Sequence, residues 1–211
     1  MKQAQLMTIY QRLLDAYGHQ NWWPADSTFE VMVGAVLTQN TAWSNVEKAI
    51  KNLKHSDCLS LDGILESSDD DLAQLIRPSG YFNIKARRLK NLCVWVTENG
   101  GETKLEDIDT VNLRASLLKV NGVGPETADD ILLYAFERPV FVVDAYTRRL
   151  FAKLSLIEGN EPYEQLRRVF EIELAPDVSL FNQYHALIVR HAKEKCLKLP
   201  DCRHCLVENL I

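Results

Sequence analysis

The sequence has no hydrophobic run of the ~18 residues that a membrane-spanning helix needs, and no N-terminal stretch joins basic residues to an apolar core. It also lacks an excess of positive charge, because 29 acidic residues outnumber 24 lysines and arginines and give a net charge of −5. We therefore expect a cytoplasmic protein with no membrane contact. If it binds a nucleic acid, it must do so through a local patch and backbone amides rather than through bulk charge.

Cysteines are few and odd in number, which argues against a disulfide framework. Two of the five, Cys58 and Cys93, are isolated, whereas Cys196, Cys202 and Cys205 cluster near the C-terminal end of the sequence. In a cytosolic protein such a cluster indicates a metal or iron–sulfur site before a disulfide.

Apolar residues make up 46% of the 211 positions and recur at helical spacing along most of the chain. Gly18 is predicted to end a first helix, and Ser27–Glu30 has the capping-box form that opens a second. The run Val140–Val143 has the composition of a strand, but four residues cannot be told from a buried connector by periodicity. We expect an all-α protein.

A glycine-containing turn links two helical segments at residues 120–128, which read Val-Asn-Gly-Val-Gly-Pro-Glu-Thr-Ala. Gly122 and Gly124 permit positive φ and close approach to the backbone, and Pro125 suits the first turn of a helix. The turn is therefore predicted to present backbone N–H groups at a helix N-terminus, where a phosphate or carboxylate binds.

Asp144 follows the run Val140–Val143 and precedes a helix-compatible segment. This is the position of a helix N-cap. A carboxylate at the edge of an apolar wall also suits stabilisation of a cationic sugar or activation of water. The two roles are compatible, and the residues alone leave both open.

The turn, the Val-Val-Asp segment and their spacing resemble the helix-hairpin-helix DNA glycosylase superfamily, the group that includes endonuclease III. Leu37–Thr41 and the terminal cysteines also fall where that family places such residues, so the resemblance covers nearly the whole chain. It implies a lobe of residues 22–132 and a lobe of residues 1–21 and 133–211, with the active site in the cleft between them. It also implies a catalytic role for Asp144, DNA contacts by Gly122, Val123, Gly124 and Thr127, and entry of Gln39 into the duplex gap left by the extruded nucleotide. The alternative for Gln39 is an amide that bridges two helices.

Two tryptophans stand side by side in Trp22-Trp23-Pro24, and Trp43 follows shortly after Gln39. Paired tryptophans commonly pack in a core or a lobe interface. A flipped base also needs aromatic faces, and a cationic alkylated purine gains cation–π attraction. Together with Glu126, these residues resemble the 3-methyladenine DNA glycosylase III branch, and we expect a base pocket formed by Trp22, Trp23, Pro24, Trp43 and Glu126.

Glu126 occupies the position at which bifunctional members of the family carry a lysine. That lysine attacks the sugar and forms a Schiff base before strand cleavage. A carboxylate forms no imine, so the resemblance implies that AP lyase activity is absent. The alternative for Glu126 is a first-turn acid that complements the helix dipole.

The most basic stretch runs from Arg77 to Lys90 and contains a Pro-Ser-Gly turn. Such a helix face is commonly just solvated. In an acidic protein with a hairpin motif it becomes the best candidate for a second phosphate contact. We expect backbone N–H donation by Ser79 and Gly80 and charge attraction from Lys85, Arg87 and Arg88. Farther along, Lys193 lies on a helix that the resemblance would pack near Asp144, and two positions stay open for it: an approach to the cleft, or the commoner solvent-facing one.

The cysteine loop departs from the family pattern C-x6-C-x2-C-x5-C, because Cys196-x5-Cys202-x2-Cys205 has one short spacing and no fourth cysteine. Three readings stay open: a [4Fe–4S] cluster on an incomplete motif, a zinc site completed by His204, or no metal.

The sequence thus predicts a monomeric, monofunctional base-excision-repair glycosylase of the prokaryotic cytosol or nucleoid. It would bind double-stranded DNA and hydrolyse the N-glycosidic bond of a flipped alkylated purine such as 3-methyladenine, with no cofactor needed for the chemistry. The alternatives are an endonuclease III-type glycosylase for oxidised pyrimidines, a non-catalytic binder of damaged or abasic DNA, and a redox or iron-sensing DNA protein.

Overall fold

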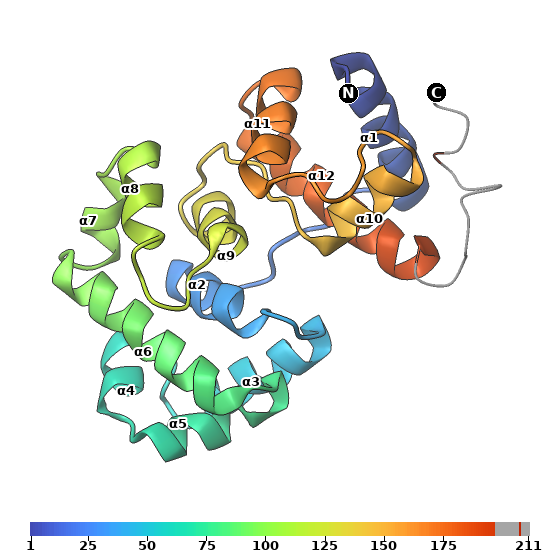
Figure 1. The fold of residues 1–211 in the computed structure, drawn as a ribbon. Coiled ribbons are helices and arrows are strands. Elements are labelled where there is room, and N and C mark those ends of the chain that lie inside the picture. The colour runs from blue at the N-terminus through green and yellow to red at the C-terminus, as the bar shows by residue number, and fades with distance from the viewer. Residues whose placement is uncertain (197–206, 208–211) are drawn as a thin grey trace. The chain divides into compact units, whose positions relative to one another are not determined.

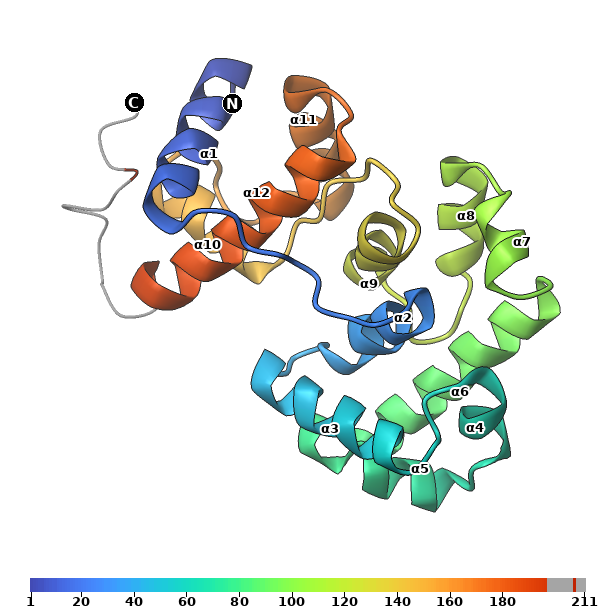
Figure 2. The same ribbon diagram turned by 180° about the vertical axis from the view of Figure 1, so that it is seen from behind.

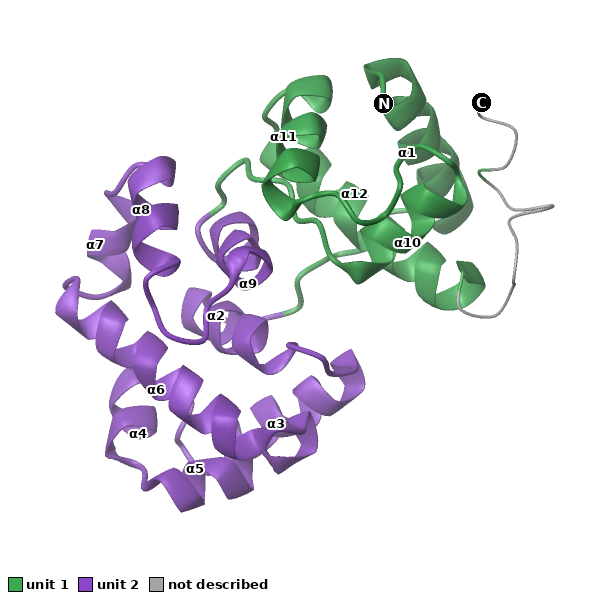
Figure 3. Ribbon diagram, in the orientation of Figure 1, with its two compact units in different colours: residues 1–24, 137–211 green, residues 25–136 purple. Residues whose placement is uncertain are grey.

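A computed structural model describes residues 1–196 and 207, and every regular element in this part of the chain is a helix (Figure 1). This confirms the all-α class. The chain divides into unit 1, residues 1–24 and 137–211, and unit 2, residues 25–136 (Figure 3). The sequence predicted a central lobe of residues 22–132, and unit 2 begins three residues and ends four residues later in the sequence. None of the described helices is both long and apolar enough to cross a membrane.

Unit 2 is built around one helix that is apolar on all sides. Nine consecutive residues of α2, Phe29 to Leu37, are buried, as expected for a helix surrounded by others. Its neighbours include α3, α6, α9 and η2. The helices of this unit are α2 (Thr28–Leu37), α3 (Trp43–His55), α4 (Leu61–Glu66), α5 (Asp69–Leu75), 3₁₀ turn η1 (Arg77–Ser79), α6 (Phe82–Glu98), α7 (Glu102–Glu106), α8 (Thr110–Leu117), α9 (Pro125–Asp130) and π-helical turn η2 (Ile131–Ala135).

The start of α2 confirms the N-cap at Ser27 but not the reciprocal bond of a capping box, because Glu30 Oε2 accepts from the Asp26 amide at 3.1 Å. Ser27 Oγ accepts a hydrogen bond from the Glu30 amide at 3.1 Å. The Glu30 carboxylate is buried and pairs with Lys54 Nζ at 2.8 Å. A charge that is removed from water needs such a partner.

Unit 1 contains α1 (Gln3–Tyr17), α10 (Ala145–Lys153), α11 (Tyr163–Leu174), α12 (Val178–His191) and π-helical turn η3 (Ala192–Cys196). Gly18 ends α1 at a φ of 66°, as predicted. Helices α1 and α12 pack together (Figure 2), and Tyr184 Oη of α12 donates to the Leu6 carbonyl of α1 at 2.7 Å. At the centre of the unit, Phe141 stacks on Phe170 with ring centroids 4.2 Å apart.

The run Val140–Val143 is a buried connector rather than a strand. Two of its backbone amides find side-chain acceptors on α11 in place of a neighbouring strand. Phe141 N donates to Glu171 Oε1 at 3.0 Å, and Val143 N lies 3.5 Å from Tyr163 Oη. Burial of this segment is therefore compatible with the need to satisfy backbone polar groups.

Candidate functional site

Asp144 stands at the point where the buried connector becomes α10, and its two carboxylate oxygens have different surroundings. Oδ1 accepts from the Thr147 amide at 2.7 Å and from Thr147 Oγ1 at 2.9 Å, which confirms the predicted N-cap. Oδ2 lies 3.5 Å from His185 Nε2 of α12. The side chain is 12% exposed. One oxygen therefore fixes the helix start, while the other makes only a long contact.

The surroundings of Asp144 keep it ionised. Burial by itself would raise the pKa of this carboxyl group, but the charge and hydrogen bond of His185, followed by the two Thr147 bonds, outweigh it. The pKa of Asp144 therefore lies below its ordinary value of 3.8. At neutral pH the group is an anion held in a fixed orientation, as required of a carboxylate that faces a developing cation.

Two cations lie close to Asp144 around the ring of Tyr146. The Arg149 guanidinium carbon is 5.6 Å and Lys193 Nζ is 5.3 Å from the centroid of that ring. Burial lowers the pKa of Lys193, and the Asp144 charge partly offsets this shift. Lys193 is thus half-buried and interacts with the charge of Asp144, so of the two positions left open for it the solvent-facing one is not found.

The hairpin of unit 2 uses its two glycines differently. Gly122 has a φ of 100°, and an added Cβ would lie 2.2 Å from Arg88 Cγ, so both conformation and packing require glycine. Gly124 has an ordinary φ of −91°, and an added Cβ would meet nothing within 4 Å. The sequence permitted a positive φ at both glycines, and of the two Gly122 adopts one. In the protein itself nothing requires glycine at Gly124.

The hairpin amides that face outward are fewer than the sequence suggested. Among the described residues, the Gly122 and Gly124 amides donate to no protein acceptor. Val123 N, by contrast, donates to the Val120 carbonyl at 3.0 Å. The Thr127 side chain is buried, and its Oγ1 accepts from Gln39 Nε2 at 2.9 Å. The Val123 amide and the Thr127 hydroxyl are therefore used within the protein, and DNA contact at these two residues stays a prediction.

Gln39 is held against the hairpin by three hydrogen bonds. Its Nε2 donates to the Gly122 carbonyl at 3.0 Å and to Thr127 Oγ1, and its Oε1 accepts from Arg88 Nη1 at 2.5 Å. The bridging role that was the alternative for Gln39 is thus present. Entry into a duplex, which stays a prediction, would require these bonds to be exchanged.

The structure corrects three expectations in the basic stretch. Lys85 is 1% exposed, and its ammonium donates to the Leu37 carbonyl, Thr41 Oγ1 and the Ser79 carbonyl at 2.7–2.8 Å. Burial lowers the pKa of Lys85 to about 8. The amides of Ser79 and Gly80 already donate to the carbonyls of Ile76 and Arg77 within η1. Lys85 therefore links η1 to the end of α2 through buried hydrogen bonds. The Ser79 and Gly80 amides are used within the turn. Arg87 is exposed.

The residues of the predicted base pocket divide between the two units. Trp22, Trp23 and Pro24 belong to unit 1, where the two indole rings meet edge to face with centroids 5.8 Å apart. In unit 2, Trp43 begins α3 and donates to Glu47 Oε1 at 3.0 Å, and Glu126 is exposed in the first turn of α9. The pocket stays a prediction.

Cys196 is buried in η3, whereas Cys202, His204 and Cys205 lie outside the described residues. Within the described part, no group of three or more His, Cys, Asp or Glu side chains is placed to hold a metal ion. A single thiolate does not define a metal site.

Comparison with known proteins identifies the class. Residues 33–176 match the family model of the HhH-GPD superfamily base excision DNA repair proteins, which is more than half of the chain. The chain belongs to this superfamily of DNA glycosylases.

Individual relatives agree with this assignment. The chain is 52% identical over 203 residues to the putative DNA repair glycosylase MJ1434 of Methanocaldococcus jannaschii, covering 95% of this chain and 92% of that protein. It is 27% identical to endonuclease III of Thermotoga maritima, with coverages of 86% and 81%. Among solved structures, H. pylori 3-methyladenine DNA glycosylase (MagIII) bound to 1,N6-ethenoadenine aligns with a TM-score of 0.80 and 29% identity, over 92% of this chain and 99% of that one. A non-covalent endonuclease III–DNA complex shares the fold, with a TM-score of 0.84 at 20% identity, over 100% and 95% of the chains.

Several side chains in these clusters were not assigned roles from the sequence. Thr147 stands three residues after Asp144, the spacing at which an N-cap meets the helix, so its bond to the carboxylate was a local signal. Tyr146 and Arg149 lie on α10 itself, within two turns of Asp144, whereas His185 reaches the site through the packing of α12 against α10. Arg88 was grouped with its basic neighbours, and its bond to Gln39 depends on tertiary structure.

Proposed function

We propose that this protein is a monofunctional DNA glycosylase that hydrolyses the N-glycosidic bond of an alkylated purine such as 3-methyladenine. The observation that carries the proposal is the geometry of Asp144. Its Oδ1 accepts two hydrogen bonds from Thr147, whereas within the described part of the chain its Oδ2 makes a single 3.5 Å contact, with His185, and is the oxygen available to the sugar.

In the proposed reaction the bond between C1′ and the base nitrogen breaks, and its electron pair leaves with the base. The sugar becomes an oxocarbenium ion, which the Asp144 anion stabilises, and water then adds to C1′ and loses a proton. Loss of a cationic alkylated base relieves its positive charge, so a strong general acid is not required. Extrusion of the nucleotide and a fitted aromatic pocket supply the remaining barrier reduction.

The alkylpurine assignment is supported by the likeness to MagIII, a 3-methyladenine glycosylase by name, and by the paired rings of Trp22 and Trp23. Trp22, Trp23, Pro24 and Trp43 are assigned to the base pocket, in which indole faces attract a cationic purine. Gly122 and Gly124 are assigned to a DNA phosphate, because their amides have no acceptor among the described residues.

The absence of AP lyase activity is proposed from Glu126. A carboxylate at the hairpin position cannot attack an abasic sugar to form an imine. Lys193 is an amine of unit 1 whose pKa responds to the charge of Asp144, and it is the group to examine first if strand cleavage is observed.

The test is incubation of a methylated duplex with the pure protein, followed by strand analysis with and without alkali. Cleavage that appears only after alkali, and is lost in Asp144→Asn, is the expected result. Cleavage without alkali contradicts the monofunctional assignment, and borohydride trapping of wild type and Lys193→Met then identifies the amine.

A second candidate function is removal of oxidised pyrimidines, favoured by the similarity to endonuclease III sequences. A duplex that contains thymine glycol separates the two substrates in the same assay. Binding of both duplexes without release of either base would instead indicate a non-catalytic binder of damaged DNA.

A further inference from the structure

A groove of about 660 Å³ opens in unit 2 between α6 and the tip of the hairpin. Its lining includes Ile84, Arg87, Arg88 and Asn91 from one face of α6, together with Asn121 and Gly122 of the hairpin. Arg87 and Arg88 stand three and four positions after Ile84, and Asn91 stands seven after it, the spacing that places side chains on one face of a helix. The hairpin is fastened to this face, because Asn91 Nδ2 donates to the Asn121 carbonyl at 3.1 Å.

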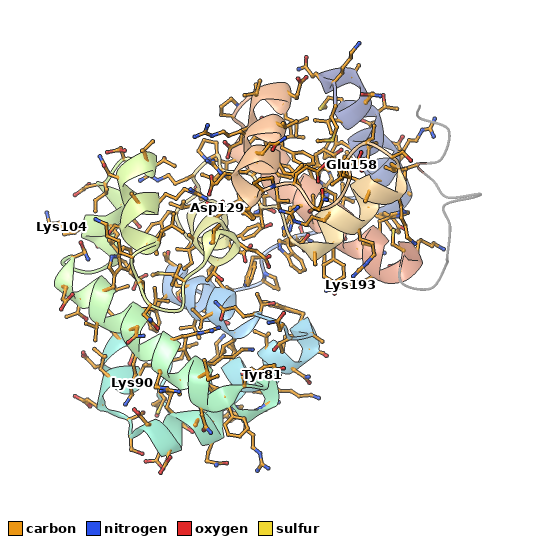
Figure 4. The ribbon with its side chains drawn as sticks, in the orientation of Figure 1. Tyr81, Lys90, Lys104, Asp129, Glu158 and Lys193 are labelled. Carbon is orange, nitrogen blue, oxygen red and sulfur yellow. The ribbon has the colours of Figure 1, made fainter. Side chains whose placement is uncertain are left out.

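The positive charge in the groove is only partly neutralised by the protein. Lys90, labelled in Figure 4, also lines it, but this ammonium pairs with Asp69 Oδ1 at 2.6 Å. The bond of Arg88 goes to the neutral amide of Gln39. Among the described residues, neither Arg87 nor Arg88 forms an ion pair with a carboxylate. Two guanidinium groups thus remain for an external anion, on a chain with a net charge of −5.

The groove also has an apolar component. Ile84 is 44% exposed, although it begins the same row of side chains as the two arginines. A surface that combines exposed aliphatic carbon with guanidinium forks matches a sugar–phosphate chain, whose sugars present carbon and whose phosphates accept bidentate hydrogen bonds. A free phosphate ion would leave the Ile84 surface unused.

We propose that this groove binds the sugar–phosphate backbone of DNA at a linkage neighbouring the one held by the hairpin amides. The proposal rests on the proposed function, since it takes DNA as the ligand. Gly122 belongs to both the hairpin and the groove, so the two contacts follow one strand without interruption. An arginine has five N–H donors, and Arg88 therefore keeps its bond to Gln39 while it holds a phosphate. Contact with the groove would thus fix the position of Gln39 relative to the bound strand.

The first test measures affinity against salt for a duplex that contains a non-cleavable abasic analogue. Each lost phosphate contact reduces the slope of log K against log salt by about 0.9 and weakens binding about tenfold. Arg87→Gln is the primary variant, because that side chain is exposed and its loss leaves the Gln39 bonds intact. Lys104→Gln, an exposed lysine of α7 in the same unit (Figure 4), removes the same charge outside the groove and should leave the slope unchanged. Equal slopes for wild type and Arg87→Gln would refute the groove contact.

The second test locates the phosphate. Neutral methylphosphonate linkages are introduced one at a time, and binding is compared between wild type and Arg87→Gln. We expect one linkage at which the neutral group lowers the duplex affinity of wild type about tenfold. At that linkage it should not lower the affinity of Arg87→Gln, because both changes remove the same contact. Additive effects at every linkage would exclude the proposal. Base release by wild type is measured separately, so an enzyme that binds through the groove but releases no alkylated base contradicts the proposed function alone.

Discussion

Two helices of this protein begin in opposite ways, and under the proposed function one start is the phosphate anchor and the other carries the reactive group. Helix α9 starts at Gly124 without a side-chain cap, and the amides of both hairpin glycines stay open. Helix α10 starts at Asp144, whose carboxylate already occupies the position that an external anion would take. A helix start without a cap binds an anion, whereas a start with an acidic cap presents one.

The same contrast separates two uses of a buried carboxylate. Asp129, in α9, is fully buried and bidentate with Arg114 at 2.6 and 3.1 Å, so both of its oxygens are committed. Asp144 commits one oxygen to its helix and leaves the other with a single long contact. An anion that is fixed but not saturated is the arrangement suited to stabilising a transient cation.

The largest expected effect is on the rate of base release, when the negative charge of Asp144 is removed and its N-cap hydrogen bonds to α10 are kept. Asp144→Asn should lower single-turnover base release by about 10²- to 10⁴-fold, the usual range for loss of such a group. The fold should be retained, since Asn is as good an N-cap as Asp. Binding to the abasic-analogue duplex should match wild type, and a variant that still releases base at the wild-type rate would remove Asp144 from the mechanism.

The next effect distinguishes the two glycines of the hairpin. Gly122→Ala should destabilise the protein by about 2 to 4 kcal/mol in urea unfolding, because its positive φ and the contact with Arg88 both oppose a Cβ. Gly124→Ala should change stability by less than about 0.5 kcal/mol, since its conformation is ordinary and its surroundings are open.

DNA binding by Gly124→Ala provides the sharper comparison. If a phosphate approaches this backbone, the added methyl group should weaken duplex affinity about tenfold while the fold is unchanged. Wild-type affinity in this variant would mean that no ligand comes close at Gly124 and that the uncapped helix start is not an anchor.

The sequence predicted those features that depend on local spacing. The cap of α2, the end of α1 at Gly18 and the N-cap at Asp144 each involve residues at most a few positions apart. The family and the all-α class were also predicted correctly. Features that depend on distant packing were harder to predict. The burial of Lys85, whose ammonium donates to three acceptors, was missed, and the position of Lys193 beside Tyr146 was only one of two alternatives. Neighbouring basic residues look alike in the sequence, so it does not show which of them the fold will bury.

The smallest effect concerns the bond that orients Asp144. Thr147 is fully buried, so Thr147→Val removes the 2.9 Å hydroxyl bond to Oδ1 without admitting water, while the amide bond at 2.7 Å remains. Loss of a bond to the charged form raises the pKa of Asp144. In wild type the depressed pKa gives stability that is complete above 3.8 and is lost as pH falls through the lower folded value, so in the variant the loss should begin at higher pH.

Base release by Thr147→Val at neutral pH should fall about three- to tenfold, corresponding to one hydrogen bond of about 1 kcal/mol. Thr147→Ser keeps the hydroxyl group. It should restore the rate of base release and the dependence of stability on pH that wild type shows at acid pH. Because Val preserves the shape of Thr and Ser preserves its chemistry, equal behaviour of the two variants would show that packing at α10, rather than the hydroxyl bond, determines how Asp144 is held.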